Sequence, residues 1–367
     1  MKSLVCLRLR RMFCCGAALF SFLIVLSASS PATAQRSLEE LIKEAGKEGR
    51  LTLMSGPSTW GSEEGVKAVQ DAFNKKYGLN ARVQFVPGPD MAQMAGRVLD
   101  ENRAKEKSAT DILAGTPETI LRLIDSGAVE TVPWQQYFPE LNREMVELNG
   151  QVIQFYTQFP GVLYNTKRVE KRNLPGQLND LLDPRWKGII GTPPYTGHLA
   201  MMAFAIKELG IERMKSFYKA FIGQTTGFLR CGEEQRVASG EFPIMFFACD
   251  VLGPIWEGEL KKIPMGGVVL KDAALMVPAY FTIPRNASNP NMAKLWGGFV
   301  LSAEGNRIYE RHTYNSSHLV PGSMANRYLK DQTTQGISFT TLRAIDMKDK
   351  LPVLLEYRKV LADMLKR

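Results

Sequence analysis

Apolar and polar residues alternate with two different periods along the first third of the chain. In residues 38–45 the apolar positions Leu38, Leu41, Ile42 and Ala45 recur every three or four residues, which predicts a helix with one buried face. Ser37 and Glu40 form a potential capping box at its start. Residues 51–54 are a short apolar run and predict a strand. The same reading gives helices at residues 65–77, 91–104 and 117–126, and strands at residues 81–86 and 111–114.

This alternation of strands and helices predicts an α/β fold with a largely parallel sheet flanked by helices. Near the C-terminus, residues 351–365 carry a wide apolar stripe and begin with Pro352 in the first turn. We therefore expect a C-terminal helix that packs on the body of the protein.

The segment from residue 159 to residue 190 reads as one supersecondary unit. An apolar strand at residues 159–164 is followed by a short turn or helix that ends at Pro175, and a second helix at residues 178–182 is stopped by Asp183 and Pro184. Trp186 and Gly188 then lead into a strand at residues 189–190.

The N-terminus has the pattern of a secretory signal peptide. Four basic residues precede an apolar stretch at residues 13–26, and Ala32-Thr33-Ala34 is a small-residue cleavage site. Residues 1–34 are therefore expected to be removed, with a retained membrane anchor as the alternative. Arg10-Arg11 partly matches a twin-arginine signal, but Leu9 occupies a position where such signals carry a hydroxyl residue, so the general secretory route is favoured.

The length and charge of the chain restrict the number of lobes and the kind of partner that can be expected. Removal of 34 residues from 367 leaves 333, which is more than one hydrophobic core usually serves, so two lobes are expected. Part of the net charge of +9 belongs to the N-terminal segment. The remaining basic residues are dispersed among acids and are not interleaved with aromatic residues, which argues against a nucleic-acid partner.

Several stretches together resemble one transport family. Tyr164-Asn165-Thr166 at a strand end, the break at Leu174-Pro175 and the run Asp180-Leu181-Leu182-Asp183-Pro184-Arg185-Trp186-Lys187-Gly188 resemble the extracellular solute-binding proteins of bacterial ABC importers, most of all the iron(III)-type branch. Residues 51–56, 109–115, 236–241, 283–290 and 299–305 are similar to further stretches of that family.

The resemblance implies a two-lobed, periplasmic binding protein-like fold of class II with two crossovers between the lobes, at residues 155–164 and 275–283. Lobe one would comprise residues 35–154 plus 276–367, and lobe two residues 155–275. A small-molecule solute would bind in the cleft of a periplasmic monomer that closes by hinge bending and delivers the solute to an ABC transporter permease in the inner membrane. An enzyme and a periplasmic sensor partner on the same fold are the alternatives.

The ligand is expected where βα turns meet the cleft, because open α/β sheets bind ligands at the carboxyl ends of their strands. Three turns combine glycine, hydroxyl groups and a following helix, which suits an anionic group; the alternative is that these residues only cap helices. Tyr164 and Tyr280, at the crossovers, are candidates for stacking or hydrogen bonding, with a buried structural role as the alternative. Asp250 is a candidate for a ligand amine, or else a helix N-cap. The turn residues are Ser55, Gly56, Ser58, Thr59 and Trp60; Gly115 and Thr116; and Thr192, Tyr195, Thr196, Gly197 and His198.

The sequence argues against ferric iron. Iron(III)-type members of the family carry two adjacent tyrosines as ligands, and no two tyrosines are adjacent in this chain. The three histidines, His198, His312 and His318, lack metal-ligand spacing. We therefore expect an organic ligand, no metal and no cofactor, with a ferric-binding protein as the alternative.

Two cysteines remain after removal of the signal peptide, Cys231 and Cys249. Export to an oxidising compartment permits a disulfide between them. The sequence leaves open whether their Cα atoms lie within reach of each other.

Overall fold

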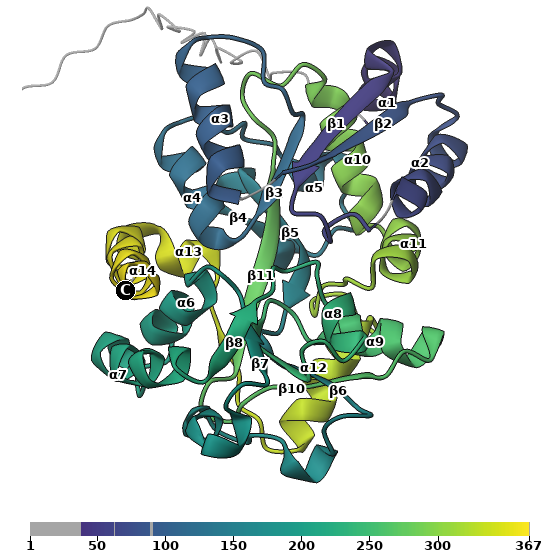
Figure 1. Ribbon diagram of the computed structural model, residues 1–367. Helices are drawn as coiled ribbons and strands as arrows, with labels where there is room; N and C mark the ends of the chain where they lie inside the picture. The colour runs from purple at the N-terminus through teal and green to yellow at the C-terminus, as the bar shows by residue number, and fades with distance from the viewer. Residues whose placement is uncertain (1–37, 62, 89–90, 367) are drawn as a thin grey trace, which may run out of the picture. The chain divides into compact units, whose positions relative to one another are not determined.

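The strands of the protein form two sheets (Figure 1). The computed structural model describes residues 38–61, 63–88 and 91–366. Sheet one has the order β2-β1-β3-β11-β5-β4, with β12 paired to β11, and sheet two has the order β10-β6-β9-β7-β8. Sheet one consists of β1 (Arg50–Ser55), β2 (Arg82–Pro87), β3 (Ile112–Gly115), β4 (Val146–Glu147), β5 (Val152–Gln158), β11 (Leu275–Thr282) and β12 (Thr340–Thr341). Sheet two consists of β6 (Gly161–Asn165), β7 (Ile190–Thr192), β8 (Thr225–Phe228), β9 (Ile244–Ala248) and β10 (Met265–Val268).

Helices flank both sheets, as the hydrophobic periodicity predicts (Figure 1). The helices predicted in the first third of the chain are confirmed as α1 to α4, and the predicted C-terminal helix is α14. The α-helices are α1 (Leu38–Glu48), α2 (Glu63–Tyr77), α3 (Met91–Arg103), α4 (Pro117–Asp125), α5 (Trp134–Tyr137), α6 (Gly197–Ala205), α7 (Gly210–Ile222), α8 (Gln235–Ala238), α9 (Leu252–Lys261), α10 (Pro290–Leu301), α11 (Ala303–Thr313), α12 (Met324–Thr334), α13 (Ala344–Met347) and α14 (Leu351–Leu365).

One local prediction differs from the structure. The sheets are mixed rather than mainly parallel, because β11 runs antiparallel to both β3 and β5, and β6 runs antiparallel to β9 and β10. The predicted helix at residues 178–182 is confirmed as a 3₁₀ helix. The predicted capping box depends on Ser37, and the predicted signal peptide covers residues 1–34; both lie outside the described residues.

The chain passes between the sheets twice in the middle of the sequence. It leaves sheet one at Gln158, the end of β5, and enters sheet two at Gly161, the start of β6. It returns between Val268, the end of β10, and Leu275, the start of β11. Both passages fall close to the two crossovers that the resemblance implies, and the lobe boundaries remain a proposal.

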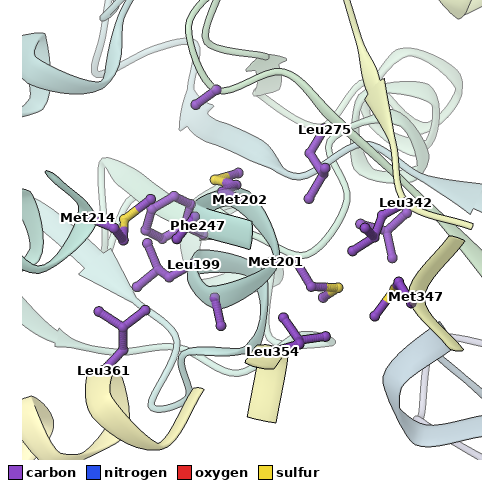
Figure 2. Packing of buried hydrophobic residues seen from close by; sticks show 14 of the residues in the cluster. Leu199, Met201, Met202, Met214, Phe247, Leu275, Leu342, Met347, Leu354 and Leu361 are labelled. Carbon is purple, nitrogen blue, oxygen red and sulfur yellow. The ribbon is translucent and has the colours of Figure 1, made fainter. Parts of the chain in front are cut away.

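Helices of the C-terminal part, residues 276–367, pack beside both sheets, and the assignment of this part to lobe one remains a prediction. Helix α12 contacts α9, and its Met324 and Ala325 are buried with Phe159 and Leu163 beside sheet two. Helix α14 contacts α6 and α7, and Figure 2 shows its Leu354 and Leu361 beside α6. The apolar stripe of α14 predicted burial correctly, but a stripe does not specify which surface it covers.

No helix within the described ranges is long and apolar enough to cross a membrane.

Candidate functional site

A cavity of about 260 Å³ is lined by residues that follow strands of both sheets. In sheet one, β1 and β3 are parallel, and β5 has the same direction as β3 because both are antiparallel to β11. In sheet two, β7 is parallel to β8 and β9. Within each sheet the carboxyl ends of these strands lie at one edge, and the loops that follow them line the cavity. The lining comprises Gly56, Pro57, Ser58, Thr59, Gly88, Met91, Ala92, Met94, Thr116, Glu118, Thr119, Tyr156, Gln158, Tyr195, Gly197, His198, Met201, Arg230, Cys231, Cys249 and Arg358.

All three glycine- and hydroxyl-rich turns reach this cavity. Helices α4 and α6 both begin at its wall, and neither Thr116 nor Thr196, their N-cap residues, makes a side-chain capping hydrogen bond. Backbone N–H groups in such first turns have no partner inside the helix and carry partial positive charge. The predicted ligand residues found in the lining are Gly56, Ser58, Thr59, Thr116, Tyr195, Gly197 and His198.

The other predicted site residues lie outside the lining. Ser55, Gly115 and Thr192 are the last residues of β1, β3 and β7 and are buried in the sheets. Trp60 is 1% exposed and packs against Phe155, Trp296 and Tyr309. A βα turn in a sequence does not reveal where the strand ends and the solvent-facing loop begins, so the prediction extends to these buried neighbours of the lining.

Thr196 and Asp250 have partners within the protein. The Thr196 hydroxyl donates to the backbone oxygen of Arg358 at 3.3 Å. The Asp250 carboxylate accepts from the backbone N–H groups of Phe159 at 2.8 Å and Gly253 at 2.9 Å, and burial raises the pKa of Asp250 to about 6. Asp250 therefore has a capping role at the start of α9, where it accepts from Gly253, although the N-cap residue itself is Val251.

The two crossover tyrosines also have structural surroundings. Tyr164 in β6 is packed so closely over Gly266 that a side chain there would meet the ring within 2.7 Å. Tyr280 donates its hydroxyl to the buried carboxylate of Glu147 at 2.6 Å, and burial raises the pKa of Tyr280. Both tyrosines therefore have the buried structural role that was the alternative, and neither lies in the cavity wall.

Of the charged side chains in the lining, two form an ion pair with each other and one does not. Arg358 of α14 forms an ion pair with Glu118 of α4 at 2.6 Å, and Glu118 is buried. Arg230 is exposed, and its guanidinium forms no ion pair within the described residues; its backbone N–H donates to Glu233. Among the charged residues of the lining, Glu118 and Arg358 neutralise each other, which leaves Arg230 as the unpaired charge; the carboxylates of Glu233 and Glu234 lie near the same wall, beside Tyr195.

The remaining polar groups of the wall are neutral. Burial lowers the pKa of His198 to about 4, so its imidazole is uncharged near pH 7. Burial raises the pKa of Tyr156 to about 12 and that of Tyr195 to about 12, which keeps both phenols protonated. The Tyr195 hydroxyl accepts from the backbone N–H of Cys231 at 2.8 Å.

Cys231 and Cys249 form a disulfide at the cavity wall, with their Cα atoms 5.9 Å apart. This separation is ordinary for a disulfide. The bond ties the loop that carries Arg230 to the carboxyl end of β9.

Sequence reasoning missed several lining residues. Arg230 directly precedes Cys231, one of the two cysteines of the candidate disulfide, but nothing in the sequence marks it as part of the wall. Gln158 and Tyr156 lie in an apolar strand, and Arg358 lies in a helix about 240 residues from Glu118 in sequence. Their place in the wall follows from the tertiary packing alone.

No group of three or more histidine, cysteine, aspartate or glutamate side chains in the described part of the chain is arranged to hold a metal ion.

Comparison with known proteins identifies the class. Residues 108–344 match the model of a family described as bacterial extracellular solute-binding protein, so the chain belongs to that family. This match confirms the predicted family, and solved structures of similar shape confirm the predicted two-lobed fold. No curated protein sequence matches the chain.

Three solved structures show the range of these neighbours. Iron-bound HitA from Pseudomonas aeruginosa is 19% identical with a TM-score of 0.65, covering 85% of this chain and 99% of its own. AfuA from Actinobacillus pleuropneumoniae, with fructose-6-phosphate bound, is 19% identical with a TM-score of 0.60, covering 73% and 85%. A putative spermidine/putrescine ABC transporter protein from Listeria monocytogenes is 14% identical with a TM-score of 0.64, covering 87% and 99%. At these identities the likeness establishes the fold alone.

Proposed function

We propose that this protein is the periplasmic solute-binding component of an ABC importer, and that it captures a small organic anion in the cavity and delivers it to the inner-membrane permease. The family supports the solute-binding role. The unpaired guanidinium of Arg230 and two helix starts without side-chain caps, all in the cavity lining, support an anion. A calorimetric screen of carboxylates, phosphonates, polyamines and ferric salts tests the proposal. A polyamine as the tightest ligand would overturn the anionic class, and turnover of the ligand would favour an enzyme.

Arg230→Met is expected to lower the affinity for the tightest-binding anionic solute of that screen by about one to two powers of ten. A hydrogen bond to a charged group contributes roughly 1.5–3 kcal/mol, and the guanidinium is the unpaired cation of the wall. Titration calorimetry measures the change, with Arg285→Met, an exposed arginine outside the lining, as the matched control. Equal affinity in wild type and Arg230→Met would remove Arg230 from the site.

Ferric citrate is expected to give no phenolate-to-iron absorption band with the purified protein. The two phenols in the wall come from separate segments and have raised pKa values, and the Glu118 carboxylate is already paired with Arg358. A visible band that disappears in Tyr156→Phe or Tyr195→Phe would instead identify a ferric-binding protein.

We also propose that the protein is a monomer that closes on its solute by bending at the two passages between the sheets. Small-angle scattering with saturating ligand should give a smaller radius of gyration than scattering without it. An unchanged radius would contradict closure.

A further inference from the structure

Two buried polar atoms in the cavity wall have no hydrogen-bond partner within the described residues. They are Oε1 of Gln158, at the end of β5, and Nε2 of His198, in the first turn of α6. Both residues line the cavity, and His198 is only 9% exposed. Buried polar groups in folded proteins are nearly always paired, so two unpaired atoms in residues of the cavity wall point to a ligand partner. Neither atom has appreciable accessible surface, so a ligand reaches it after a small rotation of the side chain.

The chemistry of the two atoms restricts what a ligand must offer. The carbonyl oxygen of Gln158 accepts only, so the ligand has to supply a donor. The neutral imidazole of His198 either donates or accepts through Nε2, depending on its tautomer. A hydroxyl group both donates and accepts, so it satisfies either arrangement. An ammonium group donates only and would add a second positive charge beside Arg230.

The rest of the cavity wall supplies an apolar surface. Met91, Met94 and Met201 line it, and Met94 and Met201 are buried. Flexible thioether side chains pack against hydrocarbon groups of varied shape. The cavity of about 260 Å³ has roughly the volume of nine liquid waters, which suits a compact ligand of metabolite size.

Resting on the proposed function, we propose that the solute is a hydroxylated organic carboxylate. Its carboxylate meets Arg230, its hydroxyl is shared by Gln158 and His198, and its hydrocarbon part lies against the three methionines. Gln158 and His198 are then the residues that distinguish a hydroxy acid from the same acid without the hydroxyl group.

Two matched pairs of probes test this inference by calorimetry: 2-hydroxy-4-methylpentanoate against 4-methylpentanoate, and malate against succinate. Each pair differs by one hydroxyl group. The wild-type protein should bind the hydroxylated member of a pair about tenfold more tightly. In Gln158→Leu, which keeps the side-chain size but removes its polar atoms, the ratio of the two affinities within a pair should fall to about one. Gln136→Leu, the same change at an exposed position outside the lining, should retain the wild-type preference.

The outcomes separate this inference from the proposed function. Equal affinities within both pairs in the wild type would overturn the hydroxy-acid class while leaving the anion-binding role intact. If both Gln158→Leu and His198→Phe kept the preference for the hydroxylated probes, neither residue would be its origin. If Gln158→Leu does not fold, His198→Phe tests the inference in its place. Binding of another anion from the screen, but of none of the four probes, overturns the inference alone. Failure of every solute in the screen overturns the proposed function as well.

Discussion

Trp60→Ala is expected to lower the free energy of unfolding by about 3–5 kcal/mol, because it removes a large buried side chain and leaves a cavity. The ring is 1% exposed. It stacks on Phe155 at 5.3 Å between ring centroids and meets Tyr309 edge-on at 5.6 Å. These contacts join the loop after β1 to β5 and α11. Chemical denaturation measures the change in stability.

Trp60→Phe is the matched control, since it retains an aromatic ring and should lose much less stability than Trp60→Ala. The sequence alone made Trp60 a candidate ligand contact. If Trp60→Ala kept wild-type stability but bound ligand weakly, the ring would belong to the site rather than to the core.

The regular elements of this fold could be predicted because their hydrophobic patterns are local. Helix α2 and strand β1 each carry a period that depends on neighbouring residues only, and both are found close to their predicted bounds. The antiparallel direction of β11 was not predicted, because its run from Leu275 to Thr282 is buried throughout and has no alternation that reveals a direction.

The candidate site was predicted in part for the same reason. Glycine and hydroxyl residues after a strand indicate a βα turn, so the turns at Ser58, Thr116 and His198 were identified and all reach the cavity. Which residue of a turn faces the cavity depends on the strand end and on packing. Thr196 and His198 illustrate this: Thr196 directs its hydroxyl to α14, and His198, two residues later, leaves Nε2 unpaired in the wall.

Arg358 shows a second limit of sequence reasoning. It belongs to α14, which packs along α6, and reaches Glu118 at the start of α4. The ion pair thus joins α14 to α4 in the wall of the cavity. Nothing in the local pattern of residues 351–365 distinguishes Arg358 from an exposed arginine on the polar face of a helix.

Replacement of both Cys231 and Cys249 by serine is expected to lower the free energy of unfolding by about 3 kcal/mol, because the bond closes a short loop between cysteines 18 residues apart. The same change should weaken the binding of an anionic solute. The bonded loop carries Arg230, and the backbone N–H of Cys231 donates to the Tyr195 hydroxyl in the wall. Without the bond this loop gains freedom, which the ligand has to remove on binding.

Thermal unfolding and calorimetry with and without a reducing agent measure both effects. The reductant should lower the stability and affinity of the wild-type protein toward those of the double variant, and it should leave the double variant unchanged. Thiol titration of the oxidised, denatured wild type should find neither cysteine of this pair free. Two titratable thiols from Cys231 and Cys249 would contradict the bond. If the double variant showed the whole predicted decrease in unfolding free energy but bound the solute with wild-type affinity, the bond would have a purely structural role. Other contacts would then fix the position of Arg230.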